Sequence, residues 1–127
     1  MTSTLDNIGK AQYALITTYR RDGRGVPTPV WVVRDGDGVA AWTPTKSGKV
    51  KRIRRDGTVL VGPCDFRGNQ TGEQVPGRAE LMDAEGTERV RALLGRKYGI
   101  MGRITVWGSV VRRGKAGTVG IRITLDS

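Results

Sequence analysis

Histidine is absent from this sequence of 127 residues, and Cys64 is its only cysteine. These two shortages exclude a disulfide within the chain, a zinc site built from cysteine and histidine, and a triad that depends on histidine. We therefore expect no metal site, and any chemistry that the protein performs should come from a bound cofactor.

Long apolar runs are also lacking. Nowhere do about 18 apolar residues follow one another, and the amino terminus lacks the apolar segment of a secretory signal. We expect a cytoplasmic protein without a membrane span, folded as one domain over residues 1–127. A chain of this length encloses a deep cavity with difficulty, so a cleft shared between two subunits is the easier way to hold a ligand.

Acidic residues are few: 12 Asp and Glu stand against 22 Lys and Arg, which gives a net charge of +10. Such a charge attracts anions, and nucleic acid, acidic membranes and polyanionic cofactors are all possible ligands. Arginine outnumbers lysine sixteen to six. This excess favours bidentate recognition of phosphate or carboxylate, although genomic base composition produces the same bias.

One stretch, from Thr43 to Asp56, holds six of the basic residues and no acid before its last position. An apolar strand is predicted to end at Trp42, and Ser47 is a candidate helix N-cap. Val50 and Ile53 lie three residues apart, as the buried positions of a short helix do. The pattern predicts a strand, a tight loop and a helix whose free N–H groups point at the loop.

Lys49 and Arg52 are also three residues apart and share one face of this helix. With Lys46 and the Ser47 hydroxyl, they could converge on one phosphate group. A basic run on a short helix is equally typical of a solvated surface, and both interpretations stay open here. No GxxxxGK[ST] or GxGxxG motif is present, which argues against the common α/β nucleotide-binding folds.

The rest of the chain alternates short β-rich segments with turn residues. Pro27 and Pro29 restrict their segment to a sheet edge or to a place where the backbone faces a ligand. Residues 100–112 fit a strand or a helix, and we predict a helix because their apolar positions step by four, three and four. We expect strands at 13–19, 27–34, 39–43, 58–62, 75–83 and 119–125, and helices at 5–12, 48–55, 83–98 and 100–112. Asp35-Gly36-Asp37-Gly38 is predicted to form a hairpin turn, Asp83 to cap the helix that follows it, and Gly99 to end that helix. This is a mainly β protein, a six-stranded antiparallel barrel with short helices and a helical insertion before the last strand, which should close the barrel.

The order of several short motifs resembles the split β-barrel flavin and deazaflavin oxidoreductases related to pyridoxamine phosphate oxidase, most closely the branch that uses coenzyme F420. The resemblance covers nearly the whole chain, and it depends on order and spacing because no single motif is decisive. The motifs are Ala14-Leu15-Ile16-Thr17-Thr18, Pro29-Val30-Trp31, Trp42-Thr43, Ser47-Gly48-Lys49-Val50-Lys51-Arg52-Ile53-Arg54-Arg55, Gly62-Pro63-Cys64-Asp65, Gly77-Arg78-Ala79 and Lys97-Tyr98-Gly99.

The resemblance implies a homodimer that holds the coenzyme in a groove between its subunits. It assigns the coenzyme phosphate to the loop and helix after the third strand and the ring to the second strand. Trp31 is equally well explained as ordinary core, and Lys51 and Arg55 as solvated side chains. The implied residues are Thr43, Ser47, Gly48, Lys49 and Arg52 for the phosphate, Pro29, Val30 and Trp31 for the ring, Lys46, Lys51 and Arg55 for the acidic tail, and Arg67 and Arg78 across the dimer.

The implied function is hydride transfer from reduced F420 to an unsaturated small molecule, with no catalytic residue identified in the chain. FMN is the nearest alternative cofactor, but it is less anionic and leaves more of the charge unexplained. A second class of function is a non-enzymatic basic barrel that binds nucleic acid or stores a cofactor. The aromatic residues are scattered rather than interleaved with basic ones, which disfavours nucleic acid.

Overall fold

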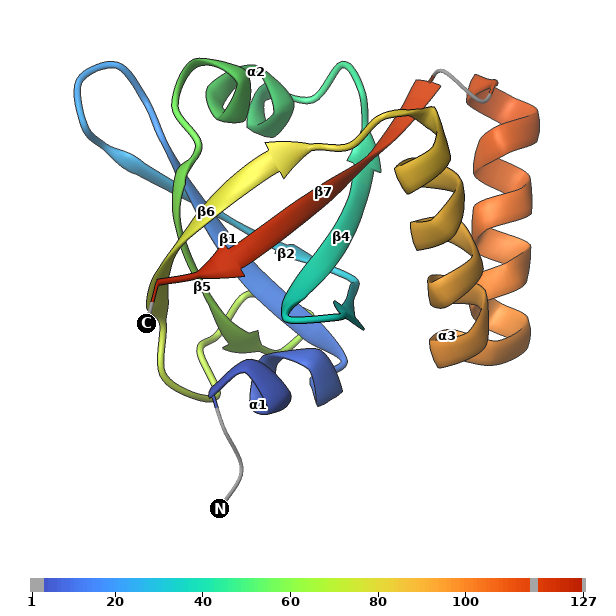
Figure 1. Ribbon diagram of the computed structural model, residues 1–127, viewed down its shortest axis with the longest axis horizontal. Coiled ribbons are helices and arrows are strands. Elements are labelled where there is room, and N and C mark those ends of the chain that lie inside the picture. The colour runs from blue at the N-terminus through green and yellow to red at the C-terminus, as the bar shows by residue number, and fades with distance from the viewer. Residues whose placement is uncertain (1–3, 115–116, 127) are drawn as a thin grey trace.

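The computed structural model of the protein describes residues 4–114 and 117–126 (Figure 1). Within them it contains seven strands and three helices, and the strands form one antiparallel sheet. No helix in the described part of the chain is long and apolar enough to span a membrane. The elements in order are α1 (Thr4–Lys10), β1 (Tyr13–Tyr19), β2 (Gly25–Val30), β3 (Val32–Asp35), β4 (Gly38–Pro44), α2 (Gly48–Arg55), β5 (Thr58–Cys64), β6 (Val75–Leu81), α3 (Ala84–Arg113) and β7 (Thr118–Leu125).

The strands follow the order β2-β1-β5-β6-β7-β4-β3 across the sheet, so its two edge strands are consecutive in the chain. This order means that the sheet curls until its ends meet at Trp31. The prediction that the last strand closes the barrel is wrong. It lies inside the sheet, between β6 and β4, and the barrel is split between β2 and β3.

The expected six strands become seven because the predicted strand at 27–34 breaks at Trp31. Its first part, β2, pairs with β1, and its second part, β3, pairs with β4. Pro27 and Pro29 lie on β2 opposite Thr17 and Leu15, at an edge of the sheet. The edge position predicted from the prolines is therefore confirmed, since neither can donate a hydrogen bond to a second neighbouring strand.

Two apolar clusters stabilise the fold. The first fills the inside of the curled sheet and includes Ile16, Val61 and Ile121, each with no exposed surface. The second contains Val33, Ala40, Val90 and Leu94 and lies where α3 covers β3 and β4. Alternation along the strands explains this arrangement, because Val32 and Ala41 belong to the first cluster while their neighbours Val33 and Ala40 belong to the second.

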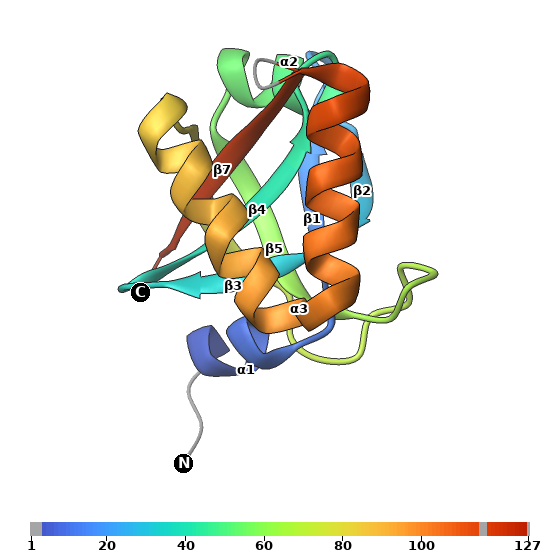
Figure 2. The ribbon, with the colours of Figure 1, turned by 90° about the vertical axis from the view of Figure 1, so that its right-hand side faces the viewer.

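The long α3 is two helices joined at Gly99, whose φ of 64° and ψ of −140° lie outside the helical region. Asp83 caps its first turn by accepting a hydrogen bond from the Gly86 N–H at 2.8 Å. The prediction of a helix over residues 100–112 is confirmed, as are the cap at Asp83 and the stop at Gly99. Figure 2 shows the two halves side by side against one flank of the sheet.

Candidate functional site

The candidate site is built around the start of α2. Ser47 has extended backbone dihedrals, and its Oγ accepts a hydrogen bond from the Val50 N–H at 3.4 Å, so the predicted N-cap is confirmed. Val50 and Ile53 are buried beneath the helix, as their spacing predicted. Burial of this pair fixes the rotation of α2 and thereby the side on which Lys49 and Arg52 lie.

The Arg52 side chain reaches from α2 to β1. Its Nε donates a hydrogen bond to Oγ1 of Thr18 at 2.6 Å, and Thr18 is fully buried. The guanidinium also lies over the first turn of α2, because a Cβ added at Gly48 would come within 2.8 Å of Arg52 Nη1. Glycine at position 48 thus leaves room for a cation beside the free N–H groups at the helix start. The two Nη atoms of Arg52 have no hydrogen-bond partner among the described residues.

Lys49 is a basic residue, yet only 7% of its surface is exposed. Burial lowers the pKa of the Lys49 ammonium, and the neighbouring Arg52 lowers it further. Burial also lowers the pKa of Arg52, with a contribution from Arg20. Within the described ranges, neither a carboxylate nor a carbonyl accepts a hydrogen bond from Lys49. Three cations therefore gather without a counter-ion, an arrangement that an anionic ligand would stabilise.

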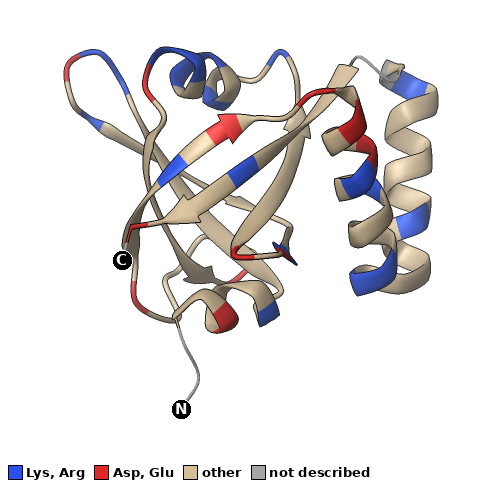
Figure 3. Cartoon of the chain, in the orientation of Figure 1, with Lys and Arg blue, Asp and Glu red and all other residues tan. Residues whose placement is uncertain are grey.

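The salt bridges of this protein lie away from α2. Five arginines form salt bridges with carboxylates between described residues, and all five lie outside α2. Figure 3 shows the basic residues of α2 next to those of the turn between β1 and β2. The acids in these salt bridges thus neutralise arginines outside α2, and among the described residues no salt bridge joins a carboxylate to Lys49 or Arg52. We call Lys49, Arg52 and Arg20 the cation cluster.

Arg20 and Thr18 were not predicted as site residues. Thr18 lies near the end of β1 and Arg20 just after it. They meet α2 because β1 pairs with β5, the strand that follows α2, although Thr18 and Arg52 are 34 residues apart in the chain. The sequence hints at this site only through the position of Arg20 in a turn with two further arginines, Arg21 and Arg24.

The residues expected to bind the acidic tail are only partly brought together. Arg55 follows Lys49 and Arg52 at three-residue steps and donates a hydrogen bond to the Tyr19 carbonyl oxygen. It lines a hollow of about 390 Å³ together with Arg20 and Arg21. Lys46 and Lys51 are exposed, and no contact joins either of them to the cation cluster.

The residues expected at the ring lie on the split edge of the barrel. Val30 is buried in the first cluster, and Pro29 is half-buried on β2. Trp31 stacks on Tyr98, with ring centroids 4.3 Å apart and an interplanar angle of 8°. Trp31 is partly buried and packs against the second apolar cluster, and the role predicted for it beside the ring stays a prediction. Tyr98 thus stabilises the break between β2 and β3, because its ring stacks on Trp31 and its hydroxyl accepts a hydrogen bond from the Val32 N–H.

The other predicted residues are spread around this centre. Thr43 is buried in β4 opposite Val119. Arg78 is exposed on β6 and, with Arg54, lines a hollow at the opposite side of α2. Arg67 lies over the ring of Phe66 in the turn between β5 and β6, with 5.3 Å between Cζ and the ring centroid.

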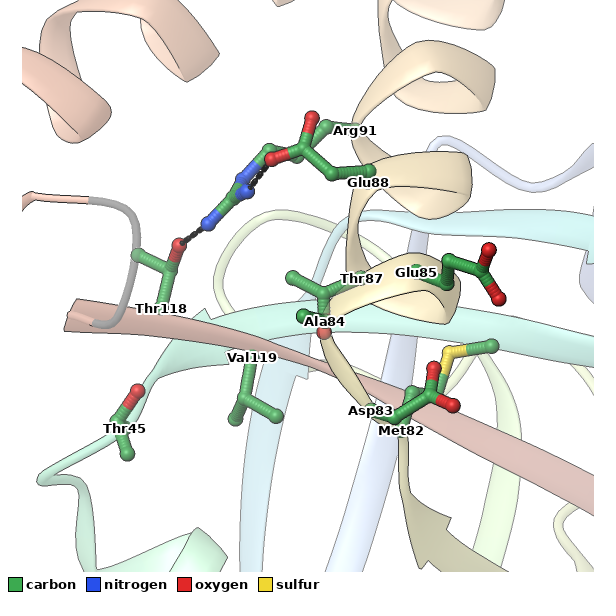
Figure 4. A pocket seen from close by; sticks show the side chains of 10 residues that line it. All are labelled: Thr45, Met82, Asp83, Ala84, Glu85, Thr87, Glu88, Arg91, Thr118 and Val119. Carbon is green, nitrogen blue, oxygen red and sulfur yellow. Dashed lines mark hydrogen bonds and ion pairs between the residues drawn. The ribbon is translucent and has the colours of Figure 1, made fainter.

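A separate cavity of about 610 Å³ lies where the start of α3 meets β7 (Figure 4). Its wall includes the apolar side chains of Met82, Ala84 and Val119. The buried Arg91 donates a hydrogen bond to Thr118 Oγ1 at 2.7 Å and forms an ion pair with Glu88. None of the predicted site residues lines this cavity, and its arginine already has a carboxylate partner, so it is unlike the cation cluster.

Comparison with known proteins places this geometry in a structural context. No protein-family model matches the chain, and no curated protein is significantly similar to it in sequence. Solved structures do match. A conserved hypothetical protein of Mycobacterium tuberculosis aligns over 100% of this chain and 82% of its own, with a TM-score of 0.71 and 20% identity. A proposed pyridoxamine 5'-phosphate oxidase of Listeria innocua aligns over 97% and 90%, with a TM-score of 0.67 and 17% identity.

An F420 reductase also has this fold, with 100% of this chain and 97% of that chain aligned, a TM-score of 0.63 and 18% identity. At such identities the likeness shows the fold and nothing finer. The structural neighbours include split-barrel proteins like pyridoxamine phosphate oxidase. The fold implied by the sequence resemblance is thus confirmed, apart from the number of strands.

Proposed function

We propose that this protein is an F420-dependent oxidoreductase that binds the coenzyme at the cation cluster and acts on an unsaturated small molecule. The observation that carries the proposal is the buried Lys49 beside Arg52 and Arg20, with no carboxylate paired to any of them. A fold shared with an F420 reductase supports the same ligand. The enzyme is proposed to be a homodimer, with its groove at the open edge of the barrel.

The described residues fit a phosphate group at the start of α2. Lys49 and Arg52 would supply charge, and Ser47 ends the loop at which the free N–H groups of the helix point. Thr43 at the end of β4 and Gly48 border the same loop. Because Arg52 is already held by Thr18, its guanidinium is oriented before the ligand arrives, which reduces the entropy lost on binding.

For the acidic tail, Arg55 is the best placed of the predicted residues, since it continues the line from Lys49 through Arg52 toward Arg20 and Arg21. Lys46 and Lys51 remain proposed contacts for a longer tail, because both are exposed and free to move toward it. Arg67 and Arg78 are proposed to act from the partner subunit.

The coenzyme would supply hydride transfer, and the protein would supply position and charge. The ring is proposed to lie along Pro29, Val30 and Trp31, where the strand edge offers backbone groups. Tyr98 beneath Trp31 is not suited to give a proton, because burial raises its pKa to about 12 and its hydroxyl is engaged by Gln12 and Val32. Its role is to hold Trp31 in place.

A direct binding comparison tests the proposal. The purified protein is titrated with F420, FMN and single-stranded DNA at equal ionic strength. We expect F420 to bind most tightly, FMN more weakly because it lacks the acidic tail, and DNA most weakly. Lengthening the glutamate tail should tighten binding at low salt, since these exposed charges are screened as salt rises.

Tighter binding of FMN would favour the flavin alternative, and DNA binding at comparable affinity would favour the nucleic-acid alternative. Affinity that does not depend on tail length would remove Lys46, Lys51 and Arg55 from the site. Oxidation of reduced F420 in the presence of unsaturated compounds then separates an enzyme from a storage protein.

A further inference from the structure

The second half of α3, residues 100–113, presents an apolar stripe to solvent. Five large side chains on this helix are between 59% and 75% exposed: Ile100, Met101, Ile104, Trp107 and Val111. Four of them step by four, three and four residues and so lie on one face. The sequence pattern predicted a helical face here, and the structure shows that nothing in the described chain covers it. Figure 1 shows this half as the outermost element on its side of the molecule.

Basic residues border the stripe on both sides. At 100° per residue, Arg103 lies about 80° to one side of the centre of the stripe and Arg112 about 100° to the other. Both are exposed. The sequence contains no Asp or Glu from Arg89 through Leu125. The second half of α3 therefore brings positive charge and no acid to the border of the stripe. The nearest acid in the first half, Glu88, lines a hollow with Arg103 and Trp107 but is paired with Arg91.

We propose that this face of α3 binds an anionic lipid surface, with the helix lying in the plane of the interface. A tryptophan-bearing apolar face flanked by arginines is the pattern of interfacial helices, whose apolar side chains enter the boundary between headgroups and acyl chains. Trp107 lies within the stripe, at the depth where amphipathic rings are favoured. Arg103 and Arg112 would extend toward lipid phosphates, and the net charge of +10 adds attraction at longer range.

Charge decides against a second copy of this chain as the occupant. If two such stripes met across a two-fold axis, each would bring Arg103 and Arg112 to the rim, and residues 100–113 contain no acid to pair with them. A patch of this size is rarely left exposed in a protein without a partner. An anionic lipid surface satisfies both the apolar centre and the positive border.

The test uses the full chain and vesicles, with no coenzyme present, so its result is independent of the proposed function. Binding is measured by co-sedimentation with vesicles of mixed phosphatidylglycerol and phosphatidylcholine, and with vesicles of phosphatidylcholine alone. We expect binding to the anionic vesicles that weakens as salt is raised, together with a blue shift of tryptophan emission. Replacing either Arg103 or Arg112 by Gln should weaken binding about five-fold.

The matched pair of variants is Trp107→Asp and Thr105→Asp, which add the same charge to the same helix. Thr105 is exposed but lies outside the stripe, about 120° from its centre. We expect Trp107→Asp to weaken vesicle binding by roughly ten-fold or more and to abolish the blue shift, and Thr105→Asp to do much less. Ile104→Ser should also weaken binding without adding charge.

Three results would overturn the proposal. The first is no binding to anionic vesicles at low salt. The second is equal loss in the Trp107 and Thr105 variants, which would indicate a diffuse electrostatic attraction of the whole protein. The third is a change in the sedimentation mass of Trp107→Asp without vesicles, which would show that the stripe lies between two copies of the chain.

Discussion

At the scale of single residues, the most informative feature is Lys49, a largely buried lysine that has no hydrogen-bond or ion-pair partner among the described residues. Burying a charge costs free energy, and proteins normally offset that cost with an ion pair or hydrogen bonds. Lys49 has neither among the described residues, and Arg52 beside it raises the cost. Such an arrangement destabilises the free protein and becomes favourable when an anion binds.

This reasoning predicts opposite effects of Lys49→Met on stability and on binding. Removing the partly desolvated ammonium while keeping an apolar side chain of similar length should raise the unfolding free energy of the free protein, on the order of 1 kcal/mol. The same change should weaken coenzyme binding by about ten- to a hundred-fold, the value of one charge-assisted hydrogen bond. Thermal unfolding of the free protein and ligand titration measure the two effects.

Arg52→Ala and Arg54→Ala provide the comparison. Arg52→Ala should weaken binding by a similar factor, whereas Arg54 lies about 200° round the helix from Arg52 and should change little. Equal losses at Lys49, Arg52 and Arg54 would mean that α2 is a diffuse basic surface.

Lys49 also gives a pH dependence. Burial lowers the pKa of Lys49, so the unfolding free energy of the free protein should increase as pH rises through that pKa, and this increase should be absent in Lys49→Met.

At the scale of elements, the break between β2 and β3 is held by the end of the first half of α3. The Tyr98 hydroxyl accepts a hydrogen bond from the Val32 N–H at 3.1 Å and donates one to the Gln12 carbonyl at 2.7 Å. The neighbouring Lys97 donates to the carbonyls of Gly9, Ala11 and Val32. Two adjacent residues thus tie α3 to the segment after α1 and to the start of β3.

We predict that Tyr98→Phe lowers the unfolding free energy by about 1 to 3 kcal/mol, because it leaves a backbone donor and a backbone acceptor without their partner while keeping the ring stacked on Trp31. Chemical denaturation measures the change. Tyr19→Phe is the control, since the Tyr19 hydroxyl has no hydrogen-bond partner in the described part of the chain. Equal unfolding free energies for the two variants would contradict this stabilising role of the Tyr98 hydroxyl.

The same tyrosine gives a pH dependence. Burial raises its pKa from 10.0 to about 12, so the unfolded chain loses this proton at a lower pH than the folded one. Its contribution to stability is therefore complete below pH 10 and is lost as pH rises toward 12. Tyr98→Phe should remove that part of the alkaline loss of stability.

At the scale of the whole molecule, the curled sheet leaves its split edge open beside the proposed ring site. The turn between β5 and β6 lies close by, since a Cβ added at Gly68 would come within 4 Å of the side chains of Leu15 and Pro29. Asp65 holds this turn by accepting hydrogen bonds from the N–H groups of Arg67 and Asn69, both at 2.9 Å. Phe66 at its tip is 65% exposed. A held turn that presents a phenylalanine to solvent suits a contact with a partner.

We therefore predict a homodimer formed on the β2 side, with a sedimentation mass near twice 13.8 kDa. Phe66→Asp should weaken the dimer and, because the groove is shared, should also weaken coenzyme binding. Trp107→Asp should leave the dimer intact, as the lipid-binding role of its helix requires. A monomer that binds one coenzyme per chain at full affinity would contradict the shared groove.

The sequence by itself determined the features that depend on neighbours a few residues away. The Ser47 cap, the turn between β3 and β4, the prolines at an edge strand and the stop at Gly99 were predicted because each depends on local dihedral preferences or on hydrogen bonds within one turn. The face shared by Lys49 and Arg52 follows from helical spacing. The resemblance to the split-barrel family likewise depends only on the order and spacing of motifs along the sequence.

Tertiary structure decided what these local pieces meet. Tyr98, 66 residues beyond Val32, bonds to the backbone where the predicted strand breaks, and the pairing of β1 with β5 brings Thr18 and Arg20 to Arg52. Spacing also predicted the face formed by Ile100, Ile104, Trp107 and Val111 without showing that it points to solvent. A periodic pattern specifies which side chains share a face, but the neighbour of that face is set by contacts between distant segments, which no local preference encodes.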